Sequence, residues 1–302
     1  MNVIEIQNVT KTFDQLTAVD NLTLSVPKGS IYGFIGPNGS GKTTTLRMIM
    51  NIFYPDSGDI RVFGEEFEGA ATDRIGYLPE ERGLYKNMKV HDLLMFYGSL
   101  KNGKNLKSEV DRWLDILDLS DWATKKVSTL SKGMSQKVQF ISTIISAPEL
   151  IILDEPFTGL DPVNTDAIRN EVLKLQGEGK TIIFSTHDMG IAEKMCDFIF
   201  MIFKGKKVLD GTLDSIQDQF GHDTLRISCE NKVSIGDITG IDKVTDFGQI
   251  QELRMVKDTD PQEVLKEIME TNRIKSFELA KPSLHDIFIR IAGPEAEETN
   301  ND

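Results

Sequence analysis

The segment Gly36-Pro37-Asn38-Gly39-Ser40-Gly41-Lys42-Thr43 carries the most information in this chain. It fits the phosphate-binding loop pattern G-x-x-x-x-G-K-[ST]. An apolar run, Ile31 to Ile35, precedes the loop and a helical-looking run, Thr44 to Phe53, follows it. Glycines let backbone N–H groups turn inward around phosphate oxygens, and a following helix aims its positive end at the same oxygens. The sequence therefore predicts a phosphate site between a strand and a helix.

Two side chains of this loop have expected roles in binding a nucleotide. Lys42 would neutralise the β and γ phosphates, and the Thr43 hydroxyl would hold Mg²⁺. The residues expected to contact the nucleotide are the loop and the residue after it: Gly36, Pro37, Asn38, Gly39, Ser40, Gly41, Lys42, Thr43 and Thr44.

A second segment, Leu150-Ile151-Ile152-Leu153-Asp154-Glu155, reads as a buried strand that ends in two acids. A strand that ends at the phosphates needs one carboxylate for Mg²⁺, which suits Asp154. Glu155 could then orient and deprotonate an attacking water. The alternative is that Asp-Glu-Pro merely terminates a strand. Beside a phosphate-binding loop, the pair predicts nucleotide hydrolysis.

Composition and charge exclude several classes of protein. The chain has 302 residues and a formal charge of −13, which argues against nonspecific nucleic-acid binding and against adsorption to anionic lipid. No apolar run has the length of a bilayer helix, and no signal peptide is expected. Two distant cysteines and four scattered histidines predict incidental thiols and no transition-metal site.

Strands alternate with helices over most of the chain, which predicts an α/β fold: a P-loop NTPase core with a mostly parallel sheet. The first thirty residues read as short strands of an N-terminal antiparallel β-subdomain, and a helical insert is expected at about 84–147. We expect an ATP-binding domain over 1–220 and a small C-terminal α+β domain over 224–292, with short strands around one helix, Pro261 to Thr271. The acidic tail 293–302 is expected to be disordered.

At this point the chain resembles the ATP-binding subunit of ATP-binding-cassette (ABC) transporters, over residues 1 to about 220. Several motifs carry the resemblance in the family's order. Leu130-Ser131-Lys132-Gly133-Met134 resembles the signature, usually Leu-Ser-Gly-Gly-Gln. Gly159-Leu160-Asp161 resembles the D-loop, His187 resembles the switch histidine, and Phe13 stands where the family has an aromatic residue.

The resemblance implies ATP and Mg²⁺ as cofactors and a role for each motif. Ser131 and Gly133 would hold the γ-phosphate of a nucleotide bound to the opposite subunit, with Asp161 also at that site. His187 would donate to the γ-phosphate and stabilise the transition state. Phe13 would stack on adenine.

Two departures from the family pattern stand out. In Tyr77-Leu78-Pro79-Glu80-Glu81, Glu80 occupies the place of the usual Q-loop glutamine, and a carboxylate there can still ligate Mg²⁺. In the signature, Lys132 and Met134 replace glycine and glutamine. The Glu80 version resembles a branch of exporter subunits that includes sodium-efflux ATPases with a small C-terminal domain.

Two functions remain in competition. In the first, the chain is the ATPase subunit of an exporter, peripheral on the cytoplasmic face of the cell membrane. It would drive a separate integral-membrane permease by ATP-dependent, head-to-tail dimerisation, as a homodimer or a heterodimer. In the second, it is a soluble cassette ATPase that acts on ribosomes or DNA. The single cassette, the acidic charge and the absence of sustained heptads between the loop and the signature favour the first, with no nucleic-acid partner.

Overall fold

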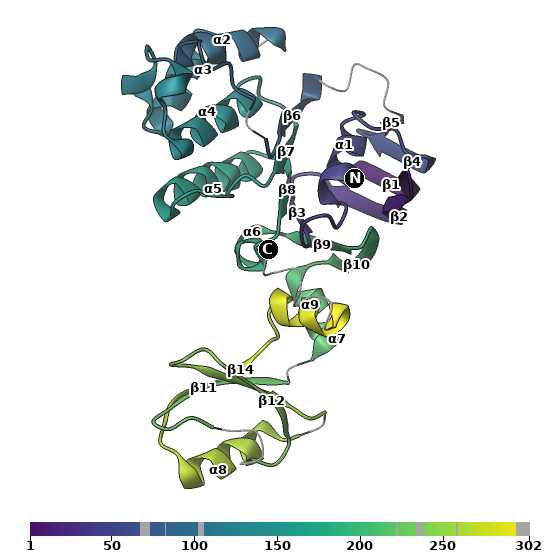
Figure 1. The fold of residues 1–302 in the computed structure, drawn as a ribbon, viewed down its shortest axis with the longest axis vertical. Helices are drawn as coiled ribbons and strands as arrows, with labels where there is room; N and C mark the ends of the chain where they lie inside the picture. Colours follow the sequence, from purple (N-terminus) through teal and green to yellow (C-terminus); the bar gives the residue numbers. More distant parts are fainter. Residues whose placement is uncertain are drawn as a thin grey trace. The chain divides into compact units, whose positions relative to one another are not determined.

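The computed structural model describes residues 1–66, 73–81, 83–101, 106–221, 223–233, 238–257 and 259–293. All of the predicted tail 293–302 except Gly293 therefore lies outside the described residues. The chain divides into two compact units, Met1–Thr212 and Leu213–Asp302, and each is described by itself (Figure 1).

The first unit opens with an antiparallel sheet, as predicted. Its strand order is β2-β1-β4-β5, from β1 (Asn2–Phe13), β2 (Leu16–Pro27), β4 (Ser57–Val62) and β5 (Glu65–Glu66). The expectation of short strands was wrong for β1 and β2, which have 12 residues each. They continue through register shifts, where Asn8 takes φ 50° and Asn21 takes φ 49°. Asparagine tolerates this left-handed conformation, so the strands bend without ending.

A six-stranded sheet forms the centre of the first unit, in the order β10-β9-β3-β8-β7-β6. All neighbours are parallel except β10, which pairs antiparallel with β9 and makes the sheet mostly parallel, as predicted. The strands are β3 (Ile31–Ile35), β6 (Ile75–Leu78), β7 (Leu150–Asp154), β8 (Thr181–Thr186), β9 (Phe198–Phe203) and β10 (Lys206–Gly211).

Both faces of this sheet are covered, which explains the continuous apolar runs. One face packs against α1 (Lys42–Ile49) and the antiparallel sheet; on β7 it presents Leu150 and Ile152. The other presents Ile151 and Leu153 to α2 (Val90–Leu100), α3 (Leu106–Ile116), α4 (Lys132–Ile144) and α5 (Pro162–Gly177). Figure 1 shows α2, α3 and α4 gathered on one side of the sheet. The short helix α6 (Met189–Met195) follows β8.

The P-loop helix is shorter than predicted. It was expected over Thr44 to Phe53, but α1 ends at Ile49. Asn51 takes φ 55°, which interrupts the helical backbone.

The second unit has its own four-stranded antiparallel sheet, in the order β12-β13-β11-β14. Its elements are α7 (Leu213–Phe220), β11 (Thr224–Cys229), β12 (Ile241–Asp246), β13 (Gln251–Met255), α8 (Pro261–Thr271), β14 (Ile274–Ala280) and α9 (Leu284–Ala292). The prediction of one helix here was wrong, because α9 also forms. Ser283 and Asp286 make a capping box at its start, and Leu284, Ile287 and Phe288 are buried.

Candidate nucleotide site

The phosphate-binding loop joins the carboxyl end of β3 to the start of α1, and two of its glycines fit where no other residue would. Gly36 has φ 154°, and a β-carbon there would stand 2.2 Å from the Ile202 carbonyl oxygen. Gly41 has φ 112°, and its β-carbon would stand 2.4 Å from the Ala18 carbonyl oxygen. Both conformations are costly for residues with a side chain. The loop is therefore held in its curved form by close backbone contact with β2 and β9.

Lys42 lies inside this curve with 5% of its surface exposed. Its ammonium donates to the carbonyl oxygens of Gly36 at 2.7 Å and Pro37 at 3.1 Å. Burial lowers the pKa of Lys42, and the nearby charges of Glu155, Asp154 and Glu80 oppose that shift. These hydrogen bonds hold the ammonium group of Lys42 in place inside the turn of the loop.

Asp154 ends β7 and is fully buried. Its Oδ1 accepts from the Ser185 hydroxyl at 2.5 Å and from the Thr43 hydroxyl at 3.3 Å. Its Oδ2 has no hydrogen-bond partner among the described residues. A buried carboxylate oxygen without a partner is costly unless something binds it, and Mg²⁺ or one of its waters suits a hard anionic oxygen. The Thr43–Asp154 pair therefore fits a magnesium ion.

Glu155 is held in an unusual backbone conformation at φ 50°. Its N–H donates to the Ser185 hydroxyl at 3.0 Å, and the Thr158 hydroxyl donates to its Oε2 at 2.9 Å. His187 Nδ1 lies 3.1 Å from both carboxylate oxygens, and Lys42 Nζ lies 3.9 Å from Oε1. Three side chains thus contact the carboxylate, a fourth holds the backbone N–H, and the residue is only 7% exposed.

Of these groups, Lys42, Thr43 and Glu155 line one cleft of about 340 Å³, within the size range of ligand pockets; the lining does not include Asp154 or His187, which contact Thr43 and Glu155. The predicted Phe13 and Glu80 line it together with the loop and Glu155. The full lining is Phe13, Leu16, Ala18, Asn38, Gly39, Ser40, Gly41, Lys42, Thr43, Thr44, Glu80 and Glu155. Phe13 is 40% exposed at the end of β1, with its ring edge-on to Phe53 at 5.4 Å between centroids.

The predicted signature and D-loop residues do not line this cleft. Ser131 is the N-cap of α4; it is exposed, and its hydroxyl accepts from Met134 N–H at 3.2 Å. Asp161 caps α5 and accepts from Asn164 N–H at 3.0 Å. The Asn164 amide lies against buried Gly133, 2.5 Å from where a β-carbon would stand. The start of α4, which carries the signature, therefore packs against the start of α5, which follows the D-loop.

Ser185 was not predicted as a site residue, although its hydroxyl donates to the Asp154 carboxylate and accepts from the backbone N–H of Glu155. Its position at the end of an apolar strand, two residues before His187, was the available signal. Ser185 can make these bonds because β8 lies beside β7, with Ser185 opposite Asp154 in the register.

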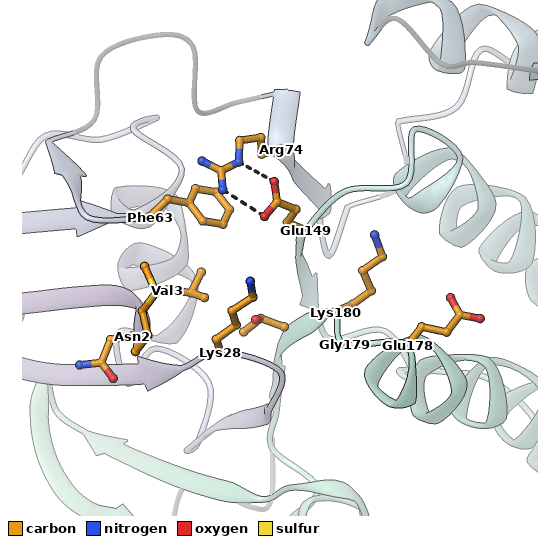
Figure 2. Close-up of a pocket in the computed structure, with 11 residues that line it drawn as sticks. Asn2, Val3, Lys28, Phe63, Arg74, Glu149, Glu178, Gly179 and Lys180 are labelled. Carbon is orange, nitrogen blue, oxygen red and sulfur yellow. Dashed lines mark hydrogen bonds and ion pairs between the residues drawn. The ribbon is translucent and has the colours of Figure 1, made fainter.

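A second pocket, of about 220 Å³, lies at the end of the sheet where β7 and β8 begin, opposite the carboxyl ends of these strands (Figure 2). Arg74 donates to Glu149 through Nε at 2.7 Å and Nη2 at 3.0 Å, and its guanidinium lies 3.7 Å from the Phe63 ring centroid. The Arg74 hydrogen bonds lower the pKa of Glu149. None of the predicted site residues lines this pocket.

The fold and the cleft define a P-loop ATPase: a mostly parallel sheet, a phosphate loop on a helix N-terminus, and a carboxylate pair at the end of β7, which β8 separates from β3. Residues 19–158 match the ABC transporter family, and residues 211–292 match the ATP-binding protein DrrA1-3-like C-terminal domain.

The sequences of two relatives match almost the whole chain, and a solved structure matches most of it. The uncharacterized ABC transporter ATP-binding protein YhaQ of Bacillus subtilis (strain 168) is 39% identical over 96% of this chain and 99% of its own. Nod factor export ATP-binding protein I of Sinorhizobium fredii (strain NBRC 101917 / NGR234) is 30% identical over 98% of this chain and 87% of its own. A solved ATP-binding subunit of an ABC transporter matches 72% of this chain and 93% of its own, with TM-score 0.68 and 28% identity.

The chain belongs to the ATP-binding proteins of ABC transporters, and it is an ATP-binding ATPase of that family. Among the described residues, no helix is long and apolar enough to cross a membrane.

Proposed function

We propose that this chain is the ATP-hydrolysing subunit of an exporter and works with a separate integral-membrane permease. It would act on the cytoplasmic face of the membrane, held there by that permease. Support comes from the Nod factor export relative, which matches both units of the chain. The alternative is a cassette ATPase that acts on ribosomes or DNA. The formal charge of −13 disfavours it, because a negatively charged protein is repelled by nucleic acid. The transported substrate would be set by the permease.

The proposal of ATP hydrolysis rests on the position of Glu155, which lines the phosphate cleft and contacts Lys42 and His187. Glu155 would accept a proton from the attacking water, and His187 would hold that carboxylate in place and face the γ-phosphate. Lys42 would bind the β and γ phosphates. Phe13, at the mouth of the same cleft, would stack on adenine.

Thr43, Asp154 and Glu80 would hold Mg²⁺. Asp154 offers its unpartnered Oδ2, and Glu80 lines the cleft from the loop after β6. The ion would neutralise phosphate charge when bound. Phosphate oxygens of the nucleotide would complete the coordination of the ion.

The nucleotide site would be shared between two chains. Ser131, Gly133 and Asp161 lie away from the chain's own cleft, so they have no phosphate to bind within one chain. In a head-to-tail dimer they would face the partner's nucleotide, and ATP would join the subunits. A homodimer is the simplest assembly, since one chain carries every motif; a heterodimer would use the same surfaces.

The permease would contact the helical insert near the Glu80 loop. A groove of about 420 Å³ lies there between the loop after β6 and helices α2 and α4, lined by Leu84, Tyr97 and Leu100 among others. Leu100 is 61% exposed and Tyr85 is 55% exposed. Exposed apolar side chains around a groove are typical of a protein interface.

Replacing Glu155 with Gln tests the catalytic assignment. The amide keeps the shape of the side chain but cannot take a proton, so we expect ATP turnover to fall by at least about a hundredfold. ATP affinity, measured with a fluorescent analogue, should stay within about twofold of the original value because Lys42 and the loop are intact. Near-normal turnover would remove Glu155 from the catalytic role.

A further inference from the structure

One face of α4 contacts the backbone of two loops that border the nucleotide cleft. Gln136, Gln139 and Thr143 are spaced three and four residues apart, so they share this face. Gln136 Nε2 donates to the Pro156 carbonyl oxygen at 3.0 Å, just after Glu155. Thr143 Oγ1 lies 3.5 Å from the Tyr77 carbonyl oxygen, on β6. The signature helix is therefore bonded to the segments that carry the proposed base and the proposed metal ligand.

Gln139 makes the most informative of these contacts. Its Nε2 lies 3.3 Å from the Pro79 carbonyl oxygen and 3.4 Å from the Glu81 carbonyl oxygen, the two carbonyls on either side of Glu80. The side chain is 4% exposed. Its Oε1 has no partner among the described residues. A buried amide whose oxygen lacks a partner costs stability, and the hydrogen bonds of its Nε2 to the loop around Glu80 offset part of that cost.

We propose that Gln139 is the positioning residue for Glu80. Its amide fixes the backbone before and after Glu80, which leaves the carboxylate to face the cleft that Glu80 lines. Because Gln139 and Ser131 stand on the same helix, a movement of the signature would also shift the loop that carries Glu80. The inference rests on the proposed role of Glu80 as a Mg²⁺ ligand.

The test measures how much Mg²⁺ strengthens nucleotide binding, without relying on hydrolysis. Affinity for a fluorescent, non-hydrolysable ATP analogue is measured with Mg²⁺ and with a chelator; the ratio is the metal-dependent gain. Four proteins are compared: the original chain, Glu80→Ala, Gln139→Leu and the double variant. Leucine is similar in size to glutamine but donates no hydrogen bond. Ser142→Ala is the matched control, since Ser142 and Gln139 line the same groove on α4 and the Ser142 hydroxyl donates to a backbone carbonyl oxygen of its own helix.

We expect Gln139→Leu to lower the gain about tenfold and to leave affinity in the chelator unchanged, as for other residues that orient a metal ligand. The double variant should show no larger loss than Glu80→Ala alone, because Gln139 acts through Glu80. Ser142→Ala should match the original chain. If Gln139→Leu fails to fold, Gln139→Met replaces it with the same expectations.

The outcomes distinguish the positioning role of Gln139 from the Mg²⁺ role of Glu80 on which it depends. A normal gain in Glu80→Ala would overturn the metal role of Glu80, and this inference with it. A reduced gain in Glu80→Ala with a normal gain in Gln139→Leu would overturn the positioning role alone. Losses that multiply in the double variant would also overturn it, since they would show that Gln139 acts independently of Glu80.

Discussion

Ser185 connects the two acids of the candidate site through a single hydroxyl. It donates to Asp154 Oδ1 and accepts from the backbone N–H of Glu155, and it is fully buried. Glu155 itself stands at φ 50°, a conformation that persists only where neighbouring contacts hold it. The hydroxyl therefore orients the proposed metal ligand and supports the strained backbone of the proposed base.

We predict that Ser185→Ala lowers ATP turnover about tenfold, because both acids lose an orienting bond. Stability should fall by about 1–3 kcal/mol, since the Glu155 N–H is left buried without a partner. Steady-state ATPase assays and denaturant unfolding measure the two effects. An unchanged turnover number would show that the acids do not need this hydroxyl.

At the scale of elements, the phosphate loop depends on its contact with a neighbouring strand. Gly41 stands at φ 112° against the Ala18 carbonyl of β2, whereas a β-carbon on Gly39, at φ 74°, would meet nothing within 4 Å. The two glycines of one loop therefore differ in what a side chain would meet.

We predict that Gly41→Ala loses ATP affinity by at least about a hundredfold, because the β-carbon would push the loop away from β2. Gly29→Ala is the control for backbone strain alone, about 1 kcal/mol, because Gly29 stands at φ 75° outside the cleft lining and its β-carbon would meet nothing within 4 Å. Equilibrium binding of a fluorescent ATP analogue compares them. Equal affinities for the two variants would contradict the argument from close contact.

The sequence predicts the central strands well and other elements less well. The apolar runs at Leu150–Leu153 and Phe198–Phe203 match β7 and β9 because both faces of those strands are covered. The lengths of β1 and β2 were not predicted, because bulges at asparagines break the period-two pattern. The cleft residues from Phe13 to Glu155 meet as their motifs suggest, but Ser185 and Gln139 act through tertiary contacts that no local pattern reveals.

At the scale of the whole molecule, the two units have separate cores. The clusters around the central sheet contain only residues of the first unit, and the cluster around Leu225, Ile227 and Leu253 contains only residues of the second. The residues that line the nucleotide cleft all come from the first unit.

We predict that a chain ending at Thr212 folds and binds ATP within about threefold of the full chain, because it keeps both cores and the whole cleft. Circular dichroism checks folding and analogue binding checks affinity. A loss of tenfold or more would mean that the second unit shapes the site or stabilises the first. The boundary follows the structure, since α7 belongs to the second unit, where Gln217 Nε2 donates to the Pro282 carbonyl oxygen.

The shared, two-chain nucleotide site is the central claim, and the molar mass of the Glu155→Gln protein in saturating Mg²⁺ and ATP tests it most directly. This variant should bind ATP without consuming it, so light scattering should give twice the mass of one chain. Without ATP, or with Ser131→Arg added, the mass should return to that of one chain, because the signature could no longer approach the partner's phosphate. A mass of one chain at saturating ATP, with binding confirmed in the same sample, would contradict the account.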